Sequence, residues 1–240
     1  MIVTLSDRTI FNPNMRLVKP ARKIPRRFNG VRGDHPSIKN GRLMKYESLL
    51  EKRVMLMLEF EPTVAAFVEQ PITIFYRISE ANVGVRSRVF RYTPDLMVYY
   101  HSHVGRSPSL IEVKTEIDLA KNKEKYAAKF EAARLFGERY NLEFEKRTEL
   151  CTPDAYCNNA NDYYHDLKPI SNKSVEEEIL RHVRGCGDVG ITNSKLHAIF
   201  REKLGGYAMV RHLIAKGALK SDWSVLIDDH SRLFSGGDDV

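Results

Sequence analysis

The sequence lacks long hydrophobic runs and has little cysteine. No stretch of the 240 residues approaches the roughly 18–20 consecutive apolar residues of a membrane helix. The first forty residues contain no apolar core of the kind found in a signal peptide, so we expect a cytoplasmic protein without a membrane partner. Cys151, Cys157 and Cys186 are odd in number and have no further ligand-like neighbours, which predicts free thiols in a reducing compartment and argues against a zinc site.

The overall composition is that of an ordinary globular protein. Hydrophobic residues make up 42% of the chain and charged residues 29%, which excludes a disordered chain, a collagen-like fibre and a disulfide scaffold. A chain of this length predicts one medium domain and one small one.

Positive charge is concentrated near the start of the chain. The net charge is +7, and residues 1–40 hold nine Lys or Arg side chains against two Asp, so the other residues sum to zero. Four prolines and no periodicity predict a basic extended N-terminal arm over residues 1–40. Such an arm is typical of nucleic-acid binding, although a solvated tail without a specific partner has the same composition. The candidate DNA contacts in the arm are Arg22, Lys23, Arg26 and Arg27.

Residues 41–150 contain patterns that predict an α/β domain with a mixed sheet. The expected elements are a helix over 43–60, strands over 72–78, 89–100 and 110–113, a helix over 119–140 capped by Asp118, and a strand over 142–148. Their order is αβββαβ. Lys121 and Lys125 on the second helix are candidate DNA contacts, and a solvated helix face is the alternative.

The remaining residues predict a linker and a small second domain. Residues 151–173 are polar and are expected to connect the domains, with a short helix around 160–167. Over 174–240, a helix capped by Ser174 precedes two shorter helices and short strands at 218–220, 225–227 and 233–234, which is the winged-helix plan. Residues 171–240 hold ten basic and ten acidic side chains, so contact with DNA through Arg211 and contact with a protein partner both stay open.

Two short motifs on predicted strands combine acids with a lysine. Pro94–Asp95 is followed by Glu112-Val113-Lys114, and alternation along a strand puts Glu112 and Lys114 on the face opposite Val113. Converging carboxylates are hard oxygen ligands that suit Mg²⁺ or Mn²⁺, and a nearby lysine can stabilise charge on a phosphate. The alternative is a surface ion pair of Glu112 with Lys114 beside a turn-forming Asp95.

The preceding helix offers a third acid. Glu51 lies near the apolar seam of this helix and is the favoured additional metal ligand. Glu47, one turn earlier, competes for that role, and either glutamate can simply be exposed on the helix surface.

Taken together, these motifs resemble the PD-(D/E)xK restriction-endonuclease-like nucleases and, more narrowly, the TnsA endonuclease subunits of heteromeric transposases. The resemblance covers residues 41–150. The segments that carry it are Ser48-Leu49-Leu50-Glu51, Leu58-Glu59-Phe60-Glu61-Pro62-Thr63-Val64, Glu69-Gln70-Pro71, Tyr92-Thr93-Pro94-Asp95 and Ile111-Glu112-Val113-Lys114.

The resemblance implies a specific chemistry. Glu51, Asp95 and Glu112 would bind Mg²⁺, with Mn²⁺ as a substitute, and Lys114 would be the catalytic lysine. The reaction implied is hydrolysis of double-stranded DNA at the 5′ ends of a transposon in the bacterial cytoplasm. A TnsB-like DDE transposase would cut the 3′ ends, and a TnsC-like AAA+ ATPase would regulate both.

Two other functions are compatible with the sequence. One is a stand-alone restriction or repair nuclease of the same fold, which would cut without partners. The other is a non-catalytic DNA-binding regulator that uses the arm and the winged helix and does not bind a metal ion at Glu51, Asp95 and Glu112.

Overall fold

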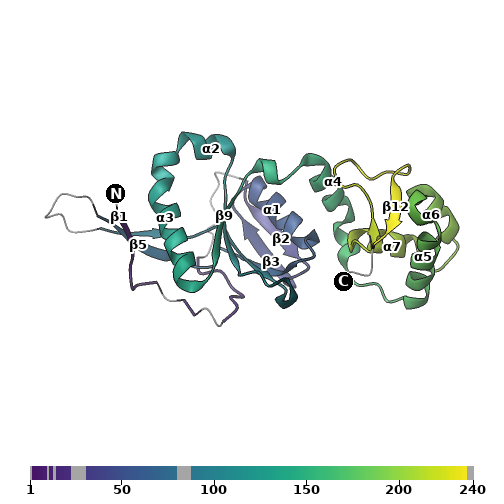
Figure 1. The fold of residues 1–240 in the computed structure, drawn as a ribbon, viewed down its shortest axis with the longest axis horizontal. Coiled ribbons are helices and arrows are strands. Elements are labelled where there is room, and N and C mark those ends of the chain that lie inside the picture. The colour runs from purple at the N-terminus through teal and green to yellow at the C-terminus, as the bar shows by residue number, and fades with distance from the viewer. Residues whose placement is uncertain (1, 10, 13–14, 23–30, 80–87, 237–240) are drawn as a thin grey trace. The chain divides into compact units, whose positions relative to one another are not determined.

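The structure is a computed structural model that describes all residues except 1, 10, 13–14, 23–30, 80–87 and 237–240 (Figure 1). It divides into two compact units, Met1–Cys151 and Thr152–Val240, and each is described by itself. The three cysteines are free thiols, as predicted. Within the described ranges, no helix has both the length and the apolar character needed to cross a membrane.

The first unit is a mixed α/β domain. Its helices are α1 (Leu49–Phe60), α2 (Glu116–Lys121) and α3 (Lys123–Tyr140). Its strands are β1 (Ile2–Leu5), β2 (Gly33–Ser37), β3 (Arg42–Tyr46), β4 (Val64–Glu69), β5 (Ile74–Ser79), β6 (Val89–Tyr92), β7 (Leu96–Tyr100), β8 (Ser109–Val113) and β9 (Glu143–Arg147).

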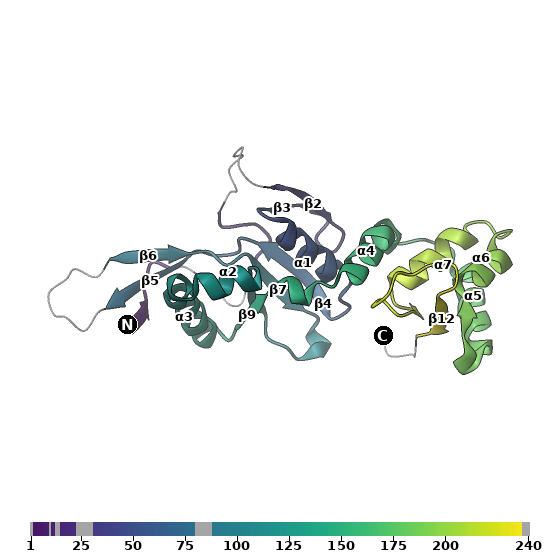
Figure 2. The same ribbon diagram turned by 90° about the horizontal axis from the view of Figure 1, so that it is seen from above.

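A four-stranded sheet forms the centre of this unit. Its order is β4-β7-β8-β9, with β8 and β9 parallel and the other pairs antiparallel. Figure 2 shows α1 and α3 on opposite sides of this sheet. Val54, Met55 and Leu58 of α1 are buried with Ile111 on one face, whereas α3 packs through Phe136 on the other. This arrangement, with β4 as an additional edge strand, is the restriction-endonuclease-like α/β core that the sequence predicts.

The N-terminal residues are part of this unit, so the prediction of an extended arm over 1–40 is wrong for the residues that the structure describes. Strand β1 pairs antiparallel with β5, which also pairs with β6, and β2 forms a hairpin with β3. The buried carboxylate of Glu59 on α1 holds this hairpin, because it accepts hydrogen bonds from Ser37 Oγ at 2.5 Å and from the Lys39 backbone N–H at 2.9 Å.

Several element boundaries differ from the prediction because of caps and a proline. Helix α1 begins after Ser48, whose hydroxyl accepts a hydrogen bond from the Glu51 N–H, and β3 takes up the residues before it. Thr115, not Asp118, caps the second helical region, which is divided into α2 and α3 at Asn122. The strand predicted over 89–100 is two strands, since Pro94 interrupts hydrogen bonding.

The second unit contains four helices and three short strands within its described residues. They are α4 (Asp154–Tyr163), α5 (Lys173–Gly185), α6 (Asn193–Phe200), α7 (Gly206–Ala215), β10 (Ile191–Thr192), β11 (Leu219–Lys220) and β12 (Arg232–Ser235). Strand β12 pairs antiparallel with both β10 and β11. The order of α5, α6, α7, β11 and β12 is compatible with a winged helix, and that assignment stays a prediction.

Two details of the second unit correct the sequence-based expectation. The segment predicted as a linker forms α4, which packs against α7, and Asn159 on it binds the backbone of Val225 and Ile227. Those two loop residues are therefore held by side-chain hydrogen bonds and form no strand. Asn172, rather than Ser174, caps α5 by accepting a hydrogen bond from the Val175 N–H.

Candidate active site

The strands of the central sheet bring Asp95 and Glu112 together. Asp95 directly precedes β7, and the register pairs Leu96 with Ile111 on β8. Ile111 and Val113 pack against α1, which leaves Glu112 on the α3 side of the sheet, as alternation predicts. Asp95 Oδ2 accepts a hydrogen bond of 2.8 Å from the Val113 N–H, so the backbone of β8 fixes the position of this carboxylate.

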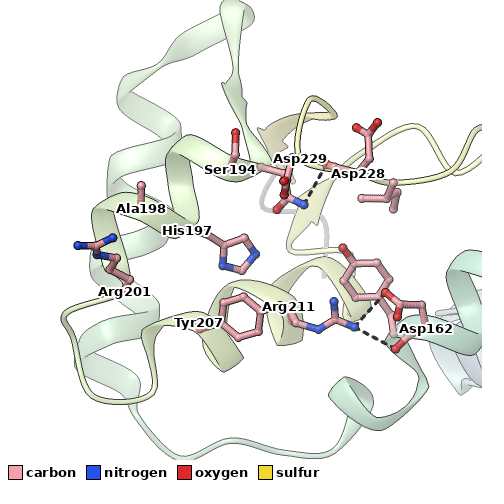
Figure 3. A pocket seen from close by; sticks show the side chains of 12 residues that line it. Asp162, Ser194, His197, Ala198, Arg201, Tyr207, Arg211, Asp228 and Asp229 are labelled. Atoms are coloured by element: carbon pink, nitrogen blue, oxygen red, sulfur yellow. Dashed lines mark hydrogen bonds and ion pairs between the residues drawn. The ribbon is translucent and has the colours of Figure 1, made fainter.

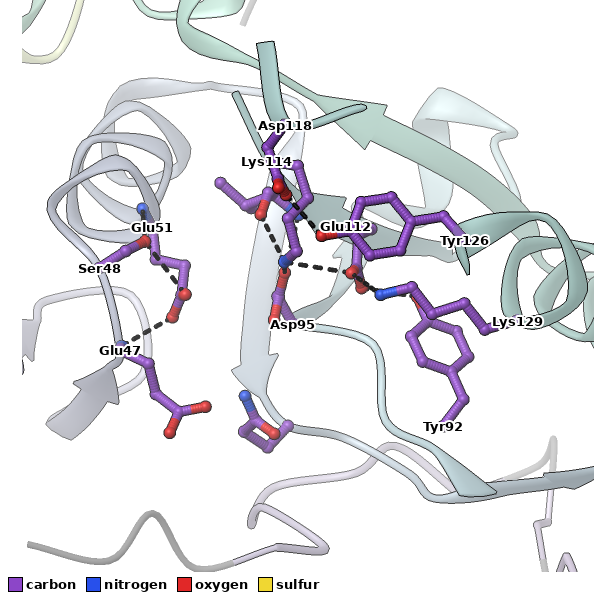
Figure 4. A network of polar contacts seen from close by, with 12 residues as sticks. Glu47, Ser48, Glu51, Tyr92, Asp95, Glu112, Lys114, Asp118, Tyr126 and Lys129 are labelled. Carbon is purple, nitrogen blue, oxygen red and sulfur yellow. Dashed lines mark hydrogen bonds and ion pairs between the residues drawn. The ribbon is translucent and has the colours of Figure 1, made fainter. Parts of the chain in front are cut away.

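The ammonium of Lys114 lies among three oxygen atoms. Its Nζ is 3.1 Å from Asp95 Oδ2, 3.1 Å from Glu112 Oε1 and 2.8 Å from the Val113 carbonyl oxygen (Figure 4). Asp95 and Glu112 are both buried, whereas the Lys114 side chain is partly exposed. The predicted association of Asp95, Glu112 and Lys114 is therefore present as one buried cluster, not as a surface ion pair.

Glu112 is held on its other side by two residues that the sequence reasoning missed. Lys129 Nζ donates to Oε1 at 2.7 Å, and the Tyr92 hydroxyl donates to Oε2 at 2.7 Å. Lys129 also lies over the ring of Tyr126, with Nζ 4.1 Å from its centroid. The sequence signal that could have identified Lys129 was its position on α3, because it falls on the helix stripe that contains Tyr126 and Phe130.

Replacing Tyr92 with phenylalanine is expected to lower the free energy of unfolding by about 1–3 kcal/mol, since a buried carboxylate oxygen loses its donor. Tyr76→Phe is the matched control, because the Tyr76 side chain is also buried and its hydroxyl has no hydrogen-bond partner in the described part of the chain. Urea unfolding without divalent ions measures both variants. Equal stability of the two would contradict a stabilising role for the Tyr92–Glu112 hydrogen bond.

Glu51 is close to the cluster but hydrogen-bonds elsewhere. Its carboxylate accepts from the Glu47 N–H at 2.8 Å and from Ser48 Oγ at 3.1 Å, an arrangement similar to a capping box. Glu47, the alternative acid, pairs instead with Arg22 and Arg32. Glu51 thus has a structural role at the start of α1, and the role of metal ligand stays a proposal.

The charges of the cluster shift its proton equilibria. Burial and the Glu112 carboxylate raise the pKa of Asp95 to about 7. Burial likewise raises the pKa of Glu51 above its ordinary value. For Lys114, burial acts to lower the pKa, but the carboxylates of Asp95 and Glu112 outweigh it and raise the pKa. Lys114 is therefore a stable cation, whereas Asp95 changes charge near neutral pH.

The oxygen atoms around Lys114 fit a hard divalent cation. They come from two carboxylates and one carbonyl, the donor types that Mg²⁺ prefers, and they already surround one positive charge. Among the residues that the structure describes, no three Asp, Glu, His or Cys side chains come together as a metal-binding group. Of the three predicted metal ligands, Asp95 and Glu112 therefore lie together around Lys114, and Glu51 does not join them in this arrangement.

Gln70 supports Asp95 from the neighbouring strand end. It is buried and adopts a left-handed backbone conformation with φ of 46°, which a residue other than glycine rarely does. Its N–H donates to the Asp95 carbonyl oxygen at 2.8 Å, and its Oε1 accepts from Arg22 Nε at 2.9 Å. This contact places Gln70 beside Asp95.

The predicted DNA contacts occupy different environments. Arg22 pairs with Glu47, whereas Lys121 and Lys125 are exposed on α2 and α3. Lys23, Arg26 and Arg27 lie outside the described residues.

Arg211 is engaged within the second unit. Its Nε donates to Asp166 at 2.9 Å, its Nη2 donates to Asp162 at 3.1 Å, and its guanidinium lies 4.3 Å from the Tyr163 ring centroid. Arg211 lines a cavity of about 420 Å³ together with residues of α4, α6 and α7. Figure 3 shows Arg211 beside His197. A guanidinium so neutralised has few donors for phosphate, which argues against the predicted DNA contact.

Comparison with known proteins agrees with this geometry. Residues 61–149 match the family model described as TnsA-like endonuclease N terminal. The matched segment contains Asp95, Glu112 and Lys114 but not Glu51. None of the curated proteins compared with the chain matches it. Over residues 61–149, the chain is therefore similar to the N-terminal domain of TnsA-like endonucleases.

Proposed function

We propose that the chain is a Mg²⁺-dependent DNA endonuclease of the PD-(D/E)xK type. Its substrate would be the 5′ ends of a transposon in a bacterial cytoplasm, and its partners a TnsB-like DDE transposase and a TnsC-like AAA+ ATPase. The observation that carries the proposal is the set of three oxygens, from Asp95, Glu112 and Val113, around the Lys114 ammonium in a TnsA-like domain.

Each residue of the cluster has a distinct task in this proposal. Asp95, Glu112 and the Val113 carbonyl would hold the divalent ion, and Glu51 would join them if its side chain turned from the start of α1. Such an ion, when bound, polarises the scissile phosphate and activates water. Lys114 would leave the carboxylates, orient the attacking water and stabilise negative charge on the phosphate.

The test is cleavage of a duplex that carries a transposon end, labelled on each strand. The full chain is incubated with Mg²⁺ or Mn²⁺, alone and with the TnsB-like transposase. Cuts at the 5′ end that require the partner support the proposal. Efficient cleavage without a partner identifies a stand-alone nuclease, and binding without cleavage under every condition identifies a regulator; both outcomes reject it.

Mg²⁺ binding is expected to strengthen as the pH rises through about 7. Below that value a proton occupies Asp95 and competes with the ion, so affinity should fall roughly tenfold per pH unit. Calorimetry between about pH 5.5 and pH 8 measures this dependence, with cleavage rate as a second readout. An affinity that stays constant across the range would show that Asp95 is already ionised or does not bind the metal.

A further inference from the structure

A cleft of about 660 Å³ lies beside Asp95 in the first unit. Its lining residues come from the segment before the β2–β3 hairpin, from the β4–β5 connection and β5, from the end of β6 and the β6–β7 connection, and from α3. The residues that matter for its chemistry are Arg22, Gln70, Arg91, Thr93, Asp95 and Lys129. The cleft is therefore lined by the cluster carboxylate and by three cations, Arg22, Arg91 and Lys129.

The three cations of the cleft differ in how they are engaged. Arg22 donates to Gln70 and pairs with Glu47, so its charge is largely neutralised. Arg91 is exposed, and its guanidinium makes no ion pair or hydrogen bond within the described residues. Arg91 is thus the cation of this cleft that has donors available for an incoming anion.

Lys129 is held in place while it retains free donors. Its Nζ lies 4.1 Å from the ring centroid of Tyr126 and 5.2 Å from those of Tyr92 and Phe130, and these contacts hold the side chain beside Glu112. Figure 4 shows Lys129 between Tyr126 and Tyr92. An ammonium has three N–H donors, and the bond to Glu112 uses one of them. The other donors remain for a ligand in the cleft.

We propose that Arg91 and Lys129 form a phosphate subsite for the DNA strand that enters the cleft, next to the phosphodiester cut at Asp95. A guanidinium binds a phosphate through two parallel hydrogen bonds, and an ammonium adds a point charge. This inference rests on the proposed nuclease function, and it assigns substrate positioning to Arg91 and Lys129.

The test measures DNA binding in the presence of a chelator, so that it does not depend on cleavage. A fluorescent duplex is titrated with the full-length wild type, Arg91→Met, Lys129→Met and the control Arg139→Met at several salt concentrations. Arg139 is an exposed cation in the last turn of α3 outside the cleft, so its variant matches the change in net charge.

Arg91→Met and Lys129→Met are each expected to weaken binding roughly tenfold at moderate salt and to reduce the slope of log K against log salt by about one, unlike Arg139→Met. A purely structural effect would not change that slope. Wild-type affinity and slope in Arg91→Met would overturn the inference, as would an equal effect of Arg139→Met. Calorimetry with Mg²⁺ adds a further check, since loss of metal binding in Arg91→Met would show that Arg91 acts on the acid cluster instead.

The two proposals fail in different ways. If the wild type never cleaves DNA but the slopes change as expected, the nuclease function is rejected and the cleft remains a DNA-binding site. If the wild type cleaves and the slopes do not change, only the subsite is rejected.

Discussion

Lys114→Met is expected to lower the cleavage rate at least about 100-fold while Mg²⁺ binding is retained or tightened. The loss of rate follows because no other ammonium lies between Asp95 and Glu112 in the described residues. The gain in affinity follows because the Lys114 ammonium, 3.1 Å from both carboxylates, no longer competes with the ion. Removing one unit charge at about 4 Å corresponds to roughly 1 kcal/mol even in water, or about fivefold in affinity.

Single-turnover cleavage and calorimetry on the same preparation separate these two effects. Lys121→Met is the control, since it removes one exposed charge from α2 away from the cluster. A Lys114→Met variant that loses Mg²⁺ binding together with cleavage would contradict the prediction. It would mean that Lys114 is needed to keep the two carboxylates together, and the three oxygens would then be a lysine site rather than a metal site.

The centre of the site was predictable from the sequence because it depends on local order. Alternation along β8 fixes the face of Glu112, and Pro94 places Asp95 between two strands. Antiparallel pairing of successive strands then brings the two acids together. None of these steps requires knowledge of a distant part of the chain.

The residues that surround the centre were not predictable in the same way. The bond from Lys129 to Glu112 depends on how α3 packs across the sheet, and the pairing of β1 with β5 joins segments about seventy residues apart in sequence. Strand β4 was not predicted because its buried, alanine-containing segment does not alternate between apolar and polar residues. Arg211 pairs with acids on a segment predicted as a linker. For Lys129, β1 and Arg211, a tertiary contact decides the outcome.

The role of Glu51 shows how one residue can satisfy two interpretations. A Ser-x-x-Glu pattern before an apolar run predicts a capped helix start, and the structure contains that cap. The same glutamate lies near enough to Lys114 for the lysine charge to act on its pKa. Helix capping explains its present position without a metal, so only metal binding by the variant Glu51→Gln can separate the two roles.

Asp95→Asn is expected to abolish Mg²⁺ binding and cleavage and, at the same time, to stabilise the fold above neutral pH. The native pKa of Asp95 is raised from its ordinary value of 3.8 to about 7, so between these values the folded state binds more protons than the unfolded state. Stability contributed by protonated Asp95 is therefore lost as the pH rises through this window. Asparagine does not titrate and can still accept the hydrogen bond from the Val113 N–H.

The stability of Asp95→Asn relative to wild type should consequently increase from about pH 4 to pH 7 and then level off, at a few kcal/mol. Denaturant unfolding in a chelator across this range measures the difference, with the exposed Asp34→Asn as control. A wild type that is as stable as Asp95→Asn at about pH 8 would show that the Lys114 ammonium fully compensates the buried carboxylate. A further outcome is that the stability difference appears in the chelator and disappears when Mg²⁺ binds the wild type alone. In that case the unfavourable free energy of burying the Asp95 and Glu112 carboxylates together is what strengthens Mg²⁺ binding.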